Sequence, residues 1–432
     1  MSTLTFLHAA DIHLDSPLRR LQQYDDATAT RLRAATRVAL ANLVDLAIAE
    51  NVAFVVIAGD LYDGDWDDVR TGLYLVQQMR RLKDAEIAVF AIAGNHDAAT
   101  KMTYNVPLPD NVTVFGHRVA ETVRLDDIGV AIHGRSFATQ SVTENLAVSY
   151  PTAIPDLFNI GILHTSLDGR EGHAPYAPCT VSDLQHKGFD YWALGHVHTR
   201  EIVSTDPWIV YPGNPQGRSI RETDERGAML VTVDRAAGAG YAIRADFHPL
   251  DDCRWLRIEI DVSQLETRDS LIEIVRSRLI DALSRHAPRA LAIRLDIVGV
   301  SAFSDDWHGN DKKWRTDILA VAEGISADVT IDKVRFFTRP AHGRGDHAAD
   351  DDPLAAVDEV VSQILADDCQ LQELASDIGK HIGHRLPSEL ESAAEPLRAE
   401  SAEFIKQLLQ NCRPLLGQRL TQSRDTHTKG GK

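Results

Sequence analysis

The sequence has few cysteines and no long apolar segment. Its four cysteines lie far apart and form no CxxC pair: Cys179, Cys253, Cys369 and Cys412. This spacing argues against a disulfide framework and a zinc finger, so we expect buried free thiols in a reducing compartment. No apolar run approaches membrane-spanning length, and the amino-terminal sequence MSTLTFLHAADIHLD has neither a basic leader nor a signal-type apolar core. We therefore expect a soluble, cytoplasmic protein without a membrane partner.

Positive charge is also scarce. The chain has 45 lysines and arginines against 63 acidic residues, which gives a formal net charge of -18 at pH 7. An acidic surface repels nucleic acid, so the charge taken alone argues against a free-standing DNA-binding protein. Two features soften this argument. Some acidic residues would be metal ligands, whose charge bound ions offset, and others crowd into residues 346–352.

Several apolar runs in the first half of the chain predict buried strands. The run IAVFAIA at residues 87–93 ends abruptly in a polar tetrad, and similar runs occupy residues 3–10, 54–58, 158–163 and 191–194. Such runs suit strands buried on both faces. Amphipathic helices are predicted between the first three strands. Their apolar faces are formed by Leu32, Val38, Leu43, Leu46 and Ala47 in the first helix, and by Val69, Leu73, Val76, Met79 and Leu82 in the second. This alternation predicts an α/β fold with a layered core of β-sheets flanked by helices.

The length of 432 residues indicates two or three structural units. Residues 1–250 are predicted to form the α/β domain, which a hairpin of residues 228–233 and 241–247 closes. We expect a small α+β capping domain, an acidic linker, a C-terminal helical region and a disordered tail to follow. These parts span residues 251–340, 341–353, 354–420 and 421–432, respectively.

Each of the five predicted strands ends in side chains of a metal-ligand type. The blocks are, in chain order, Asp11-x-His13, Gly59-Asp60-x-x-Asp63, Gly94-Asn95-His96-Asp97, His164, and Gly195-His196-x-His198. Ligands of α/β sheets bind at strand ends, and buried polar groups are costly unless something satisfies them. A set without thiolate suits Mn²⁺, Fe²⁺ or Zn²⁺ rather than Ca²⁺. Two such ions activate water for attack on phosphorus, and an imidazole that binds no metal can protonate the leaving oxygen.

This order of blocks resembles the calcineurin-like metallophosphoesterase superfamily over residues 3–234. The resemblance implies one metal ion bound by Asp11, His13, Asp60 and His198. It implies a second ion bound by Asp60, Asn95, His164 and His196, with Asp60 bridging the two.

The resemblance also assigns a catalytic histidine. His96 matches the family's histidine that binds no metal, and Asp63 stands where its orienting partner is often found. Many DNA-processing relatives carry histidine at that partner position, so Asp63 is closer to the phosphatase pattern. Asp97 could orient His96 instead, and Gly94 is interpreted as permitting a tight turn between strand and site.

Two further segments narrow the resemblance. The sequence DIHLDSPL at the first strand end and YPGNPQGRSIRE at residues 211–222 resemble the SbcD-type DNA exonuclease subunits, most closely their YhaO-like branch. This likeness implies a Mn²⁺-dependent exonuclease that acts on DNA ends, with a capping domain that shapes access to the site. It also implies an SMC-type coiled-coil ATPase partner and a possible homodimer. The C-terminal helices could grip the coiled coil of that partner or pack against the protein's own domains.

Contacts with a substrate are less defined in the sequence. The candidates for phosphate binding are Arg19, Arg20, Arg170, Arg218 and Arg221. Guanidinium groups match phosphate oxygens, but each of these arginines could equally pair with nearby acids. Tyr176 could stack on a base, whereas Trp192 lies within an apolar strand and is predicted to be core.

Three functions are consistent with these features. The first is a two-metal nuclease subunit acting on DNA ends. The second is a phosphatase or phosphodiesterase for small molecules or phosphoproteins, which Asp63 and the acidic net charge favour. The third is a DNA-end scaffold without catalysis, which the long helical C-terminus favours. The complete ligand set makes the scaffold the weakest of the three.

Overall fold

The computed structural model describes residues 3–16, 26–63, 69–99, 106–169, 174–235, 240–341, 353–382, 405–406 and 408–409. Predictions for Arg19, Arg20, Arg170, Cys412, nearly all of the acidic linker and the tail at residues 421–432 lie outside the described residues. The chain divides into two compact units. The first comprises Met1–Ile258, Arg278–Arg294 and Ile325–Lys333, and the second comprises Glu259–Ser277, Leu295–Gly324 and Val334–Lys432. The predicted domain boundaries stay predictions.

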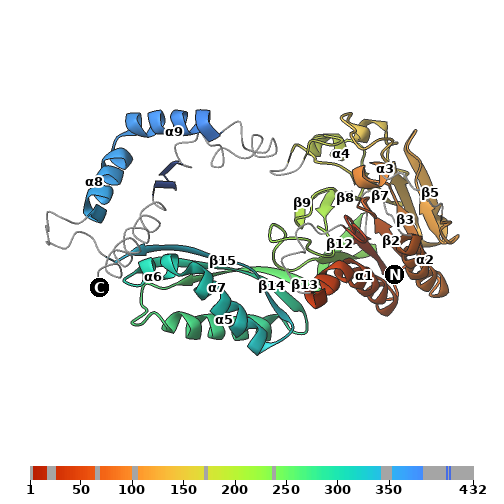
Figure 1. The fold of residues 1–432 in the computed structure, drawn as a ribbon. Coiled ribbons are helices and arrows are strands. Elements are labelled where there is room, and N and C mark those ends of the chain that lie inside the picture. The colour runs from red at the N-terminus through yellow and green to blue at the C-terminus, as the bar shows by residue number, and fades with distance from the viewer. Residues whose placement is uncertain are drawn as a thin grey trace, which may run out of the picture. The chain divides into compact units, whose positions relative to one another are not determined.

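Helices and strands alternate along the first half of the chain, as Figure 1 shows. The helices are α1 (Asp26–Ala49), α2 (Val69–Asp84), α3 (Asn95–Ala99), η2 (Asp126–Ile128), η3 (Leu146–Ser149), α4 (Val181–Gln185), α5 (Ser270–His286), α6 (Ser304–Gly309), α7 (Asp311–Ile325), α8 (Pro353–Ala366) and α9 (Asp368–Ile382). The strands are β1 (Leu4–Ala9), β2 (Phe54–Ile57), β3 (Ala88–Ala91), β4 (Val112–Val114), β5 (Glu121–Leu125), β6 (Val130–Gly134), β7 (Phe158–His164), β8 (Tyr191–Gly195), β9 (Glu201–Thr205), β10 (Trp208–Tyr211), β11 (Gly227–Arg235), β12 (Tyr241–Pro249), β13 (Cys253–Asp261), β14 (Ala290–Ser301) and β15 (Val329–Pro340).

Two six-stranded sheets pack face to face in the first unit. Their strand orders are β12-β11-β1-β2-β3-β4 and β5-β6-β7-β8-β10-β9. Side chains that alternate along β1 explain the packing, because Phe6 points to the opposing sheet and Leu7 points away from it. Phe6 stacks on Phe54 of β2 with ring centroids 5.1 Å apart and meets Tyr191 of β8 edge-on at 5.4 Å. The core between the sheets is therefore continuous, with aromatic rings from both sheets in contact.

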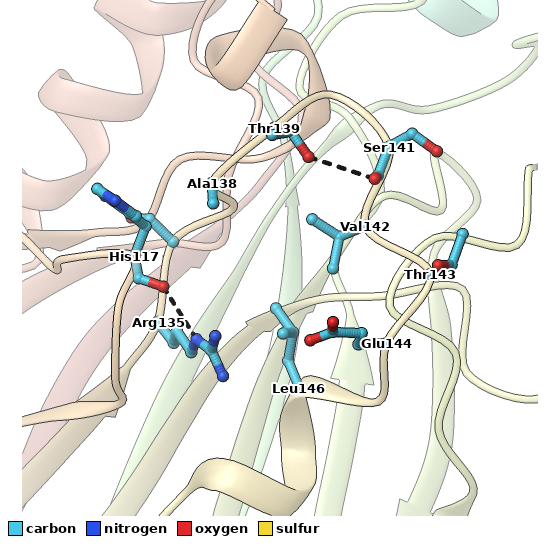
Figure 2. Close-up of a pocket in the computed structure, with 10 residues that line it drawn as sticks. His117, Arg135, Ala138, Thr139, Ser141, Val142, Thr143, Glu144 and Leu146 are labelled. Carbon is cyan, nitrogen blue, oxygen red and sulfur yellow. Dashed lines mark hydrogen bonds between the residues drawn. The ribbon is translucent and has the colours of Figure 1, made fainter.

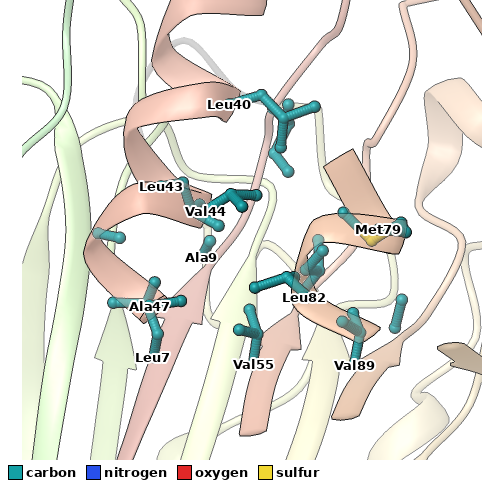
Figure 3. Close-up of a cluster of buried hydrophobic side chains, with 14 of the residues drawn as sticks. Leu7, Ala9, Leu40, Leu43, Val44, Ala47, Val55, Met79, Leu82 and Val89 are labelled. Atoms are coloured by element: carbon teal, nitrogen blue, oxygen red, sulfur yellow. The ribbon is translucent and has the colours of Figure 1, made fainter. Parts of the chain in front are cut away.

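Helices α1 and α2 cover the outer face of the first sheet. Figure 3 shows Leu40 and Leu43 of α1 and Met79 and Leu82 of α2 directed at the strands. These contacts confirm the predicted layered α/β core. The predicted apolar faces were wrong in detail. Val38 and Leu73 are exposed, at 36% and 53% of their surface, because each helix turns a neighbouring stripe of side chains toward the sheet.

The outer face of the second sheet is covered by α4 and by the loops around it. Trp192 of β8 is fully buried there among Leu184 of α4, Phe189 and Tyr150, which confirms that Trp192 belongs to the core. The predicted hairpin is also confirmed, since β11 and β12 pair antiparallel from Gly227–Pro249 to Arg235–Tyr241. The short strands β4, β5, β6, β9 and β10 were not predicted.

The rest of the chain forms a small sheet and helices. Strands β13, β14 and β15 form a three-stranded sheet in that order, and α5 and α7 lie along one of its faces (Figure 1). In the C-terminal segment, Leu371 and Ala375 of α9 pack against Ile405. None of the helices in the described ranges is long and apolar enough to cross a membrane. Cys179 and Cys253 are buried free thiols as expected, but Cys369 on α9 is exposed.

Candidate metal centre

The predicted site residues come from the carboxyl ends of strands in both large sheets. Strands β1, β2 and β3 run parallel, and so do β7 and β8. Beyond β1, the backbone N–H of Asp11 donates to Gly59 O at 3.0 Å, which joins the ends of β1 and β2. The imidazole of His164 then links the two sheets, because its Nδ1 donates to Ala58 O at 2.9 Å. Acids and imidazoles from distant segments thereby share one edge of the sandwich.

One group of possible ligands consists of Asp11, His13 and His198, whose ligand atoms lie within 4.8 Å of one another. Nε2 of His13 lies 3.2 Å from Nε2 of His198, and Oδ1 of Asp11 lies 3.8 Å from that same His198 nitrogen. Oδ2 of Asp60 lies 3.8 Å from Nε2 of His13. The structure thus brings together the four residues that the sequence predicts for one metal ion.

A second group consists of Asp11, Asp60 and His164, with ligand atoms again within 4.8 Å of one another. Nε2 of His164 lies 3.5 Å from Oδ2 of Asp60 and 3.0 Å from Oδ1 of Asn95. Asp60 therefore reaches both groups through one carboxylate oxygen. This is the position that a carboxylate bridging two metal ions requires.

His196, the remaining predicted ligand, lies beside these groups. Its backbone N–H donates to both carboxylate oxygens of Asp11, at 3.1 and 3.0 Å, and its Nε2 lies 2.9 Å from Ala174 O. Its ring centroid is 5.2 Å from that of His164 and 5.4 Å from that of Tyr176. Because Nε2 of a neutral ring donates to the carbonyl, Nδ1 carries the lone pair that a metal-binding nitrogen needs.

Within each of the two groups, lone pairs of the ligand atoms point inward. Nδ1 of His164 donates to a backbone carbonyl, so its Nε2 presents a lone pair to the oxygens of Asn95 and Asp60. Nδ1 of His198 lies 2.8 Å from a carboxylate, so its Nε2 presents a lone pair to His13. Nδ1 of His13 is buried without a hydrogen-bond partner. The facing acceptors of His164 and Asn95 repel one another unless a cation lies between them, and an unpartnered buried nitrogen such as Nδ1 of His13 is costly.

Burial sets the protonation states at this edge. It lowers the pKa of His13 and lowers that of His164 to about 3, so both rings are neutral at pH 7. Burial also raises the pKa of Asp11, with the neighbouring Asp60 adding to the effect, and raises the pKa of Asp60 to about 6. A divalent cation reverses this balance, since it favours ionised carboxylates and coordinates neutral imidazoles. The donor set therefore fits a pair of bound metal ions.

The backbone is strained at the same positions. Asp11, His13, Asp60 and His196 have φ angles of 52°, 47°, 52° and 94°, in the left-handed region that L-residues rarely adopt. Each such residue costs on the order of 1 kcal/mol or more and persists only where the surrounding structure imposes it. Here the strand-end hydrogen bonds impose it and turn the side chains inward.

His96 and Asp63 form a hydrogen-bonded pair beside the ligand groups. Nδ1 of His96 lies 2.7 Å from Oδ1 of Asp63. Burial lowers the pKa of His96, but the hydrogen bond to Asp63 and the negative charges of Asp60 and Asp63 together outweigh burial and raise it. Burial has the opposite effect on Asp63, yet hydrogen bonds from His96 and Ser16 lower the pKa of Asp63 to about 2. An ionised carboxylate beside an imidazole of raised pKa suits that imidazole to proton donation.

Asp97, the alternative partner predicted for His96, contacts backbone groups instead. Its carboxylate accepts hydrogen bonds from the backbone N–H groups of Leu61, Tyr62 and Gly94, at 3.1, 2.9 and 3.0 Å. It therefore ties the loop after β2 to the end of β3, and Asp63 is the carboxylate that orients His96.

Comparison with known proteins decides the family. A sequence model of calcineurin-like phosphoesterases matches residues 4–200, and a model of the middle domain of metallophosphoesterase YhaO matches residues 255–339. The uncharacterized metallophosphoesterase YhaO of Bacillus subtilis (strain 168) is 34% identical over 305 residues, which cover 70% of this chain and 73% of the relative. The chain belongs to the calcineurin-like metallophosphoesterase family. It is a metal-dependent phosphoester hydrolase.

More distant relatives of this metallophosphoesterase carry a functional name. A DNA double-strand break repair protein Mre11 from Sulfolobus acidocaldarius is 28% identical over 251 residues, or 53% of this chain and 60% of the relative. A protein of the same name from Halobacterium salinarum is 27% identical over 281 residues, or 64% of this chain and 67% of the relative. The chain thus spans about two thirds or less of these two relatives.

Glycine at position 94 of the metallophosphoesterase is required by close packing. A Cβ atom at Gly94 would lie 2.2 Å from Oδ1 of Asp60 and 2.8 Å from Cε1 of His164. The backbone of Gly94 is not left-handed, so this position does not use the conformational freedom of glycine, and its role in a tight turn stays a prediction. Its missing side chain leaves the space in which the two ligand side chains meet.

Two residues of the segment YPGNPQGRSIRE face the metallophosphoesterase site. Glu222 accepts from Nδ1 of His198, and Arg218 lies against both Asp63 and Glu222. Glu222 was not predicted, and its spacing of four residues from Arg218 was the available signal. Arg221 is exposed, and Arg19 lies outside the described residues. Arg218 is thus paired with acids, and its proposed contact with phosphate has no support in the described contacts.

A separate pocket of about 180 Å³ opens beside the loop that follows β6. Figure 2 shows Arg135, which donates to His117 O at 3.1 Å, and Glu144 on its lining. Ser136 connects this lining to the end of β3, because its Oγ accepts from Ala93 N at 2.9 Å. The pocket contains none of the predicted ligands or the His96 and Asp63 pair, so it is not the metallophosphoesterase site.

Proposed function

We propose that the protein is a dinuclear-metal phosphodiesterase that cleaves DNA at its ends, with Mn²⁺ as the working metal. The observation that carries the DNA substrate is the likeness to proteins named DNA double-strand break repair protein Mre11, at 28% identity over 251 residues. The acidic net charge of -18 weighs against unaided DNA binding, which is one reason to expect a partner.

The residues of the site divide the work of hydrolysis. Asp11, His13, Asp60 and His198 would hold one ion, and Asp60 with Asn95, His164 and His196 would hold the other. When bound, the two ions activate water and neutralise charge on the phosphoryl oxygens. His96 keeps a proton on Nε2 for the leaving oxygen while Asp63 holds its Nδ1, and 36% of its side chain is exposed to a substrate.

A purified-protein nuclease assay tests this proposal. With Mn²⁺ the wild type should degrade linear duplex DNA, and His96→Ala should lower the rate by about 10²–10⁴-fold, the usual contribution of an acid–base group. Metal content and the unfolding midpoint should stay at wild-type values. His117→Ala is the matched control, because His117 is exposed and lies outside the site. Degradation that continues in the His96 variant would remove the proposed role of His96.

The substrate class is tested separately. Asp63 follows the phosphatase pattern, and this observation favours a second candidate function, a phosphatase or phosphodiesterase for small molecules or phosphoproteins. Turnover of a phosphomonoester, a small phosphodiester and linear DNA should be compared with the same metal. The proposed function requires the strongest preference for DNA, whereas a strong monoester preference would establish the second candidate.

We further propose that the C-terminal helices bind an SMC-type coiled-coil ATPase and that the protein acts as a homodimer. Leu371 and Ala375 of α9 are buried with Ile364 and Leu365 of α8 packed against them, whereas Val360 of α8 is 54% exposed. An unburied apolar side chain on an amphipathic helix suits a helical partner. Copurification of the ATPase with the full chain, and its loss after Val360→Glu, would support this partner. Unchanged copurification would contradict it.

A further inference from the structure

The side chain of Glu222 is held in place from several directions. Its Oε2 accepts from the backbone N–H of Arg218 at 2.7 Å and from Nδ2 of Asn214 at 3.0 Å. Its Oε1 lies 2.8 Å from Nδ1 of His198. An anchored carboxylate on Nδ1 fixes the ring so that Nε2 points at Asp11.

The guanidinium of Arg218 connects this carboxylate to a second one. Its Nη1 lies 3.1 Å from Oδ2 of Asp63, and its Nη2 lies 3.3 Å from Oε1 of Glu222. Asp63 uses its other oxygen to hold His96. The side chains of Arg218, Asp63 and Glu222 are only 19%, 15% and 14% exposed, respectively, so both ion pairs are shielded from solvent. Nε of Arg218 is buried without a hydrogen-bond partner, so the two carboxylates at Nη1 and Nη2 determine the orientation of the guanidinium group.

We propose that Arg218 and Glu222 are positioning residues that lock the proton donor His96 and the metal ligand His198 into one arrangement. Glu222 orients His198 directly. Arg218 acts through Asp63 on His96 and through Glu222 on His198. The segment Gly217–Glu222 thereby couples the proton-donating side of the site to its metal-binding side. A guanidinium that served a DNA phosphate instead would have to leave both carboxylates without their counter-charge.

The proposal rests on phosphoester hydrolysis and stands whether or not DNA is the substrate. Its test therefore uses two small phosphodiesters, a phenyl ester and a p-nitrophenyl ester, whose leaving groups differ in acidity. Arg218→Ala should lower kcat for the phenyl ester by about 10–100-fold, the usual effect of a group that supports a metal-site residue. KM should stay within about twofold, and the p-nitrophenyl ester should be affected much less, because its leaving group needs little proton donation. Guanidinium ion added to this variant should restore part of the activity.

Metal binding gives a readout that does not depend on activity. Titration calorimetry with Mn²⁺ alone should show affinity about 10–100-fold weaker for Glu222→Gln. Arg218→Lys should fall between the wild type and Arg218→Ala, since an ammonium cannot span two carboxylates. Arg244→Ala is the control, because Arg244 is 72% exposed on β12 and pairs only with Asp246 among the ion pairs described for it.

Other results would overturn the proposal. A rise in KM with unchanged kcat for Arg218→Ala would make Arg218 a substrate contact. Equal losses for both esters at saturating Mn²⁺, together with a lowered unfolding midpoint, would make it merely structural. Wild-type Mn²⁺ affinity in Glu222→Gln would remove the role of Glu222. Absence of DNA cleavage by the wild type would count against the DNA substrate alone and would leave these comparisons valid.

Discussion

Charged groups on the three-stranded sheet pair with one another, whereas acceptors at the metal centre face other acceptors. On the sheet, Arg335 of β15 donates to both oxygens of Asp296 on β14, at 2.7 and 2.5 Å, and Arg294 pairs with Asp332. These charges satisfy each other. At the metal centre, lone pairs of His164 and Asn95 face each other at 3.0 Å. Polar groups that satisfy one another indicate structure, and polar groups that do not indicate a missing ligand.

The largest effect is expected from removing the carboxylate that reaches both ligand groups. Asp60→Asn should lower phosphodiester hydrolysis by at least about 10³-fold, the upper range for losing one electrostatic contributor. It should also stabilise the metal-free protein by about 1–3 kcal/mol, because a buried charge disappears while an oxygen remains for His96 N. Urea unfolding in EDTA measures this gain. A metal-free variant less stable than the metal-free wild type would contradict the view that the Asp60 carboxylate is unsatisfied without metal.

Removing one partner of a satisfied pair should have the opposite consequence. Arg335→Ala leaves Asp296, whose side chain is 8% exposed, without its guanidinium, and should destabilise the protein by about 1–3 kcal/mol. Arg335 itself is 30% exposed, which places the loss toward the lower end. Hydrolysis of a small phosphodiester at a temperature where the variant is folded should be unchanged. Replacing both partners with leucine and methionine should recover most of the stability, and failure to recover it would contradict this interpretation.

A smaller effect is expected from a buried histidine away from the metal centre. His133 lies between Thr122 Oγ1 at 2.8 Å and Asn159 Oδ1 at 3.1 Å, and burial lowers its pKa. Below about pH 6.5 the unfolded chain binds a proton that the folded chain does not, so stability should fall as the pH falls. The contribution reaches at most about 1.4 kcal/mol per pH unit.

The variant His133→Gln isolates this contribution. Unfolding in urea at pH 7.5, 6.5 and 5.5, with EDTA present, should show a shallower decline in stability for the variant than for the wild type. His117→Gln, at an exposed position, should follow the wild type. Parallel declines for wild type and His133→Gln would show that His133 is protonated in the folded state.

The sequence predicted the strands that are buried on both faces and missed those at the sheet margins. Strands β1, β2, β3, β7 and β8 consist of apolar runs, because helices or the opposing sheet cover each side. Strand β4 has three residues, and β5 reads ETVRL with three exposed and two half-buried positions. Such segments carry too little periodic signal, and partner strands far along the chain decide their pairing.

The ligand types of the site were visible in the sequence, but their backbone and their supporting contacts were not. Left-handed φ angles at Asp11 and His13 run against the preference of L-residues, so only the completed strand-end hydrogen bonds explain them. Asp63 could be chosen over Asp97 only after Asp97 was found holding backbone N–H groups. Arg218 reached the site through a loop whose course local sequence does not determine.

The two sheets each supply ligands to the same centre, Asp60 from the first and His164 from the second. A metal ion bound to both would therefore connect the two sheets and would stabilise only the folded chain. Each site saturated at about 100 times its dissociation constant adds about 2.7 kcal/mol to the free energy of unfolding. The melting temperature should consequently rise with Mn²⁺ concentration, and this rise ranks candidate metals without any substrate.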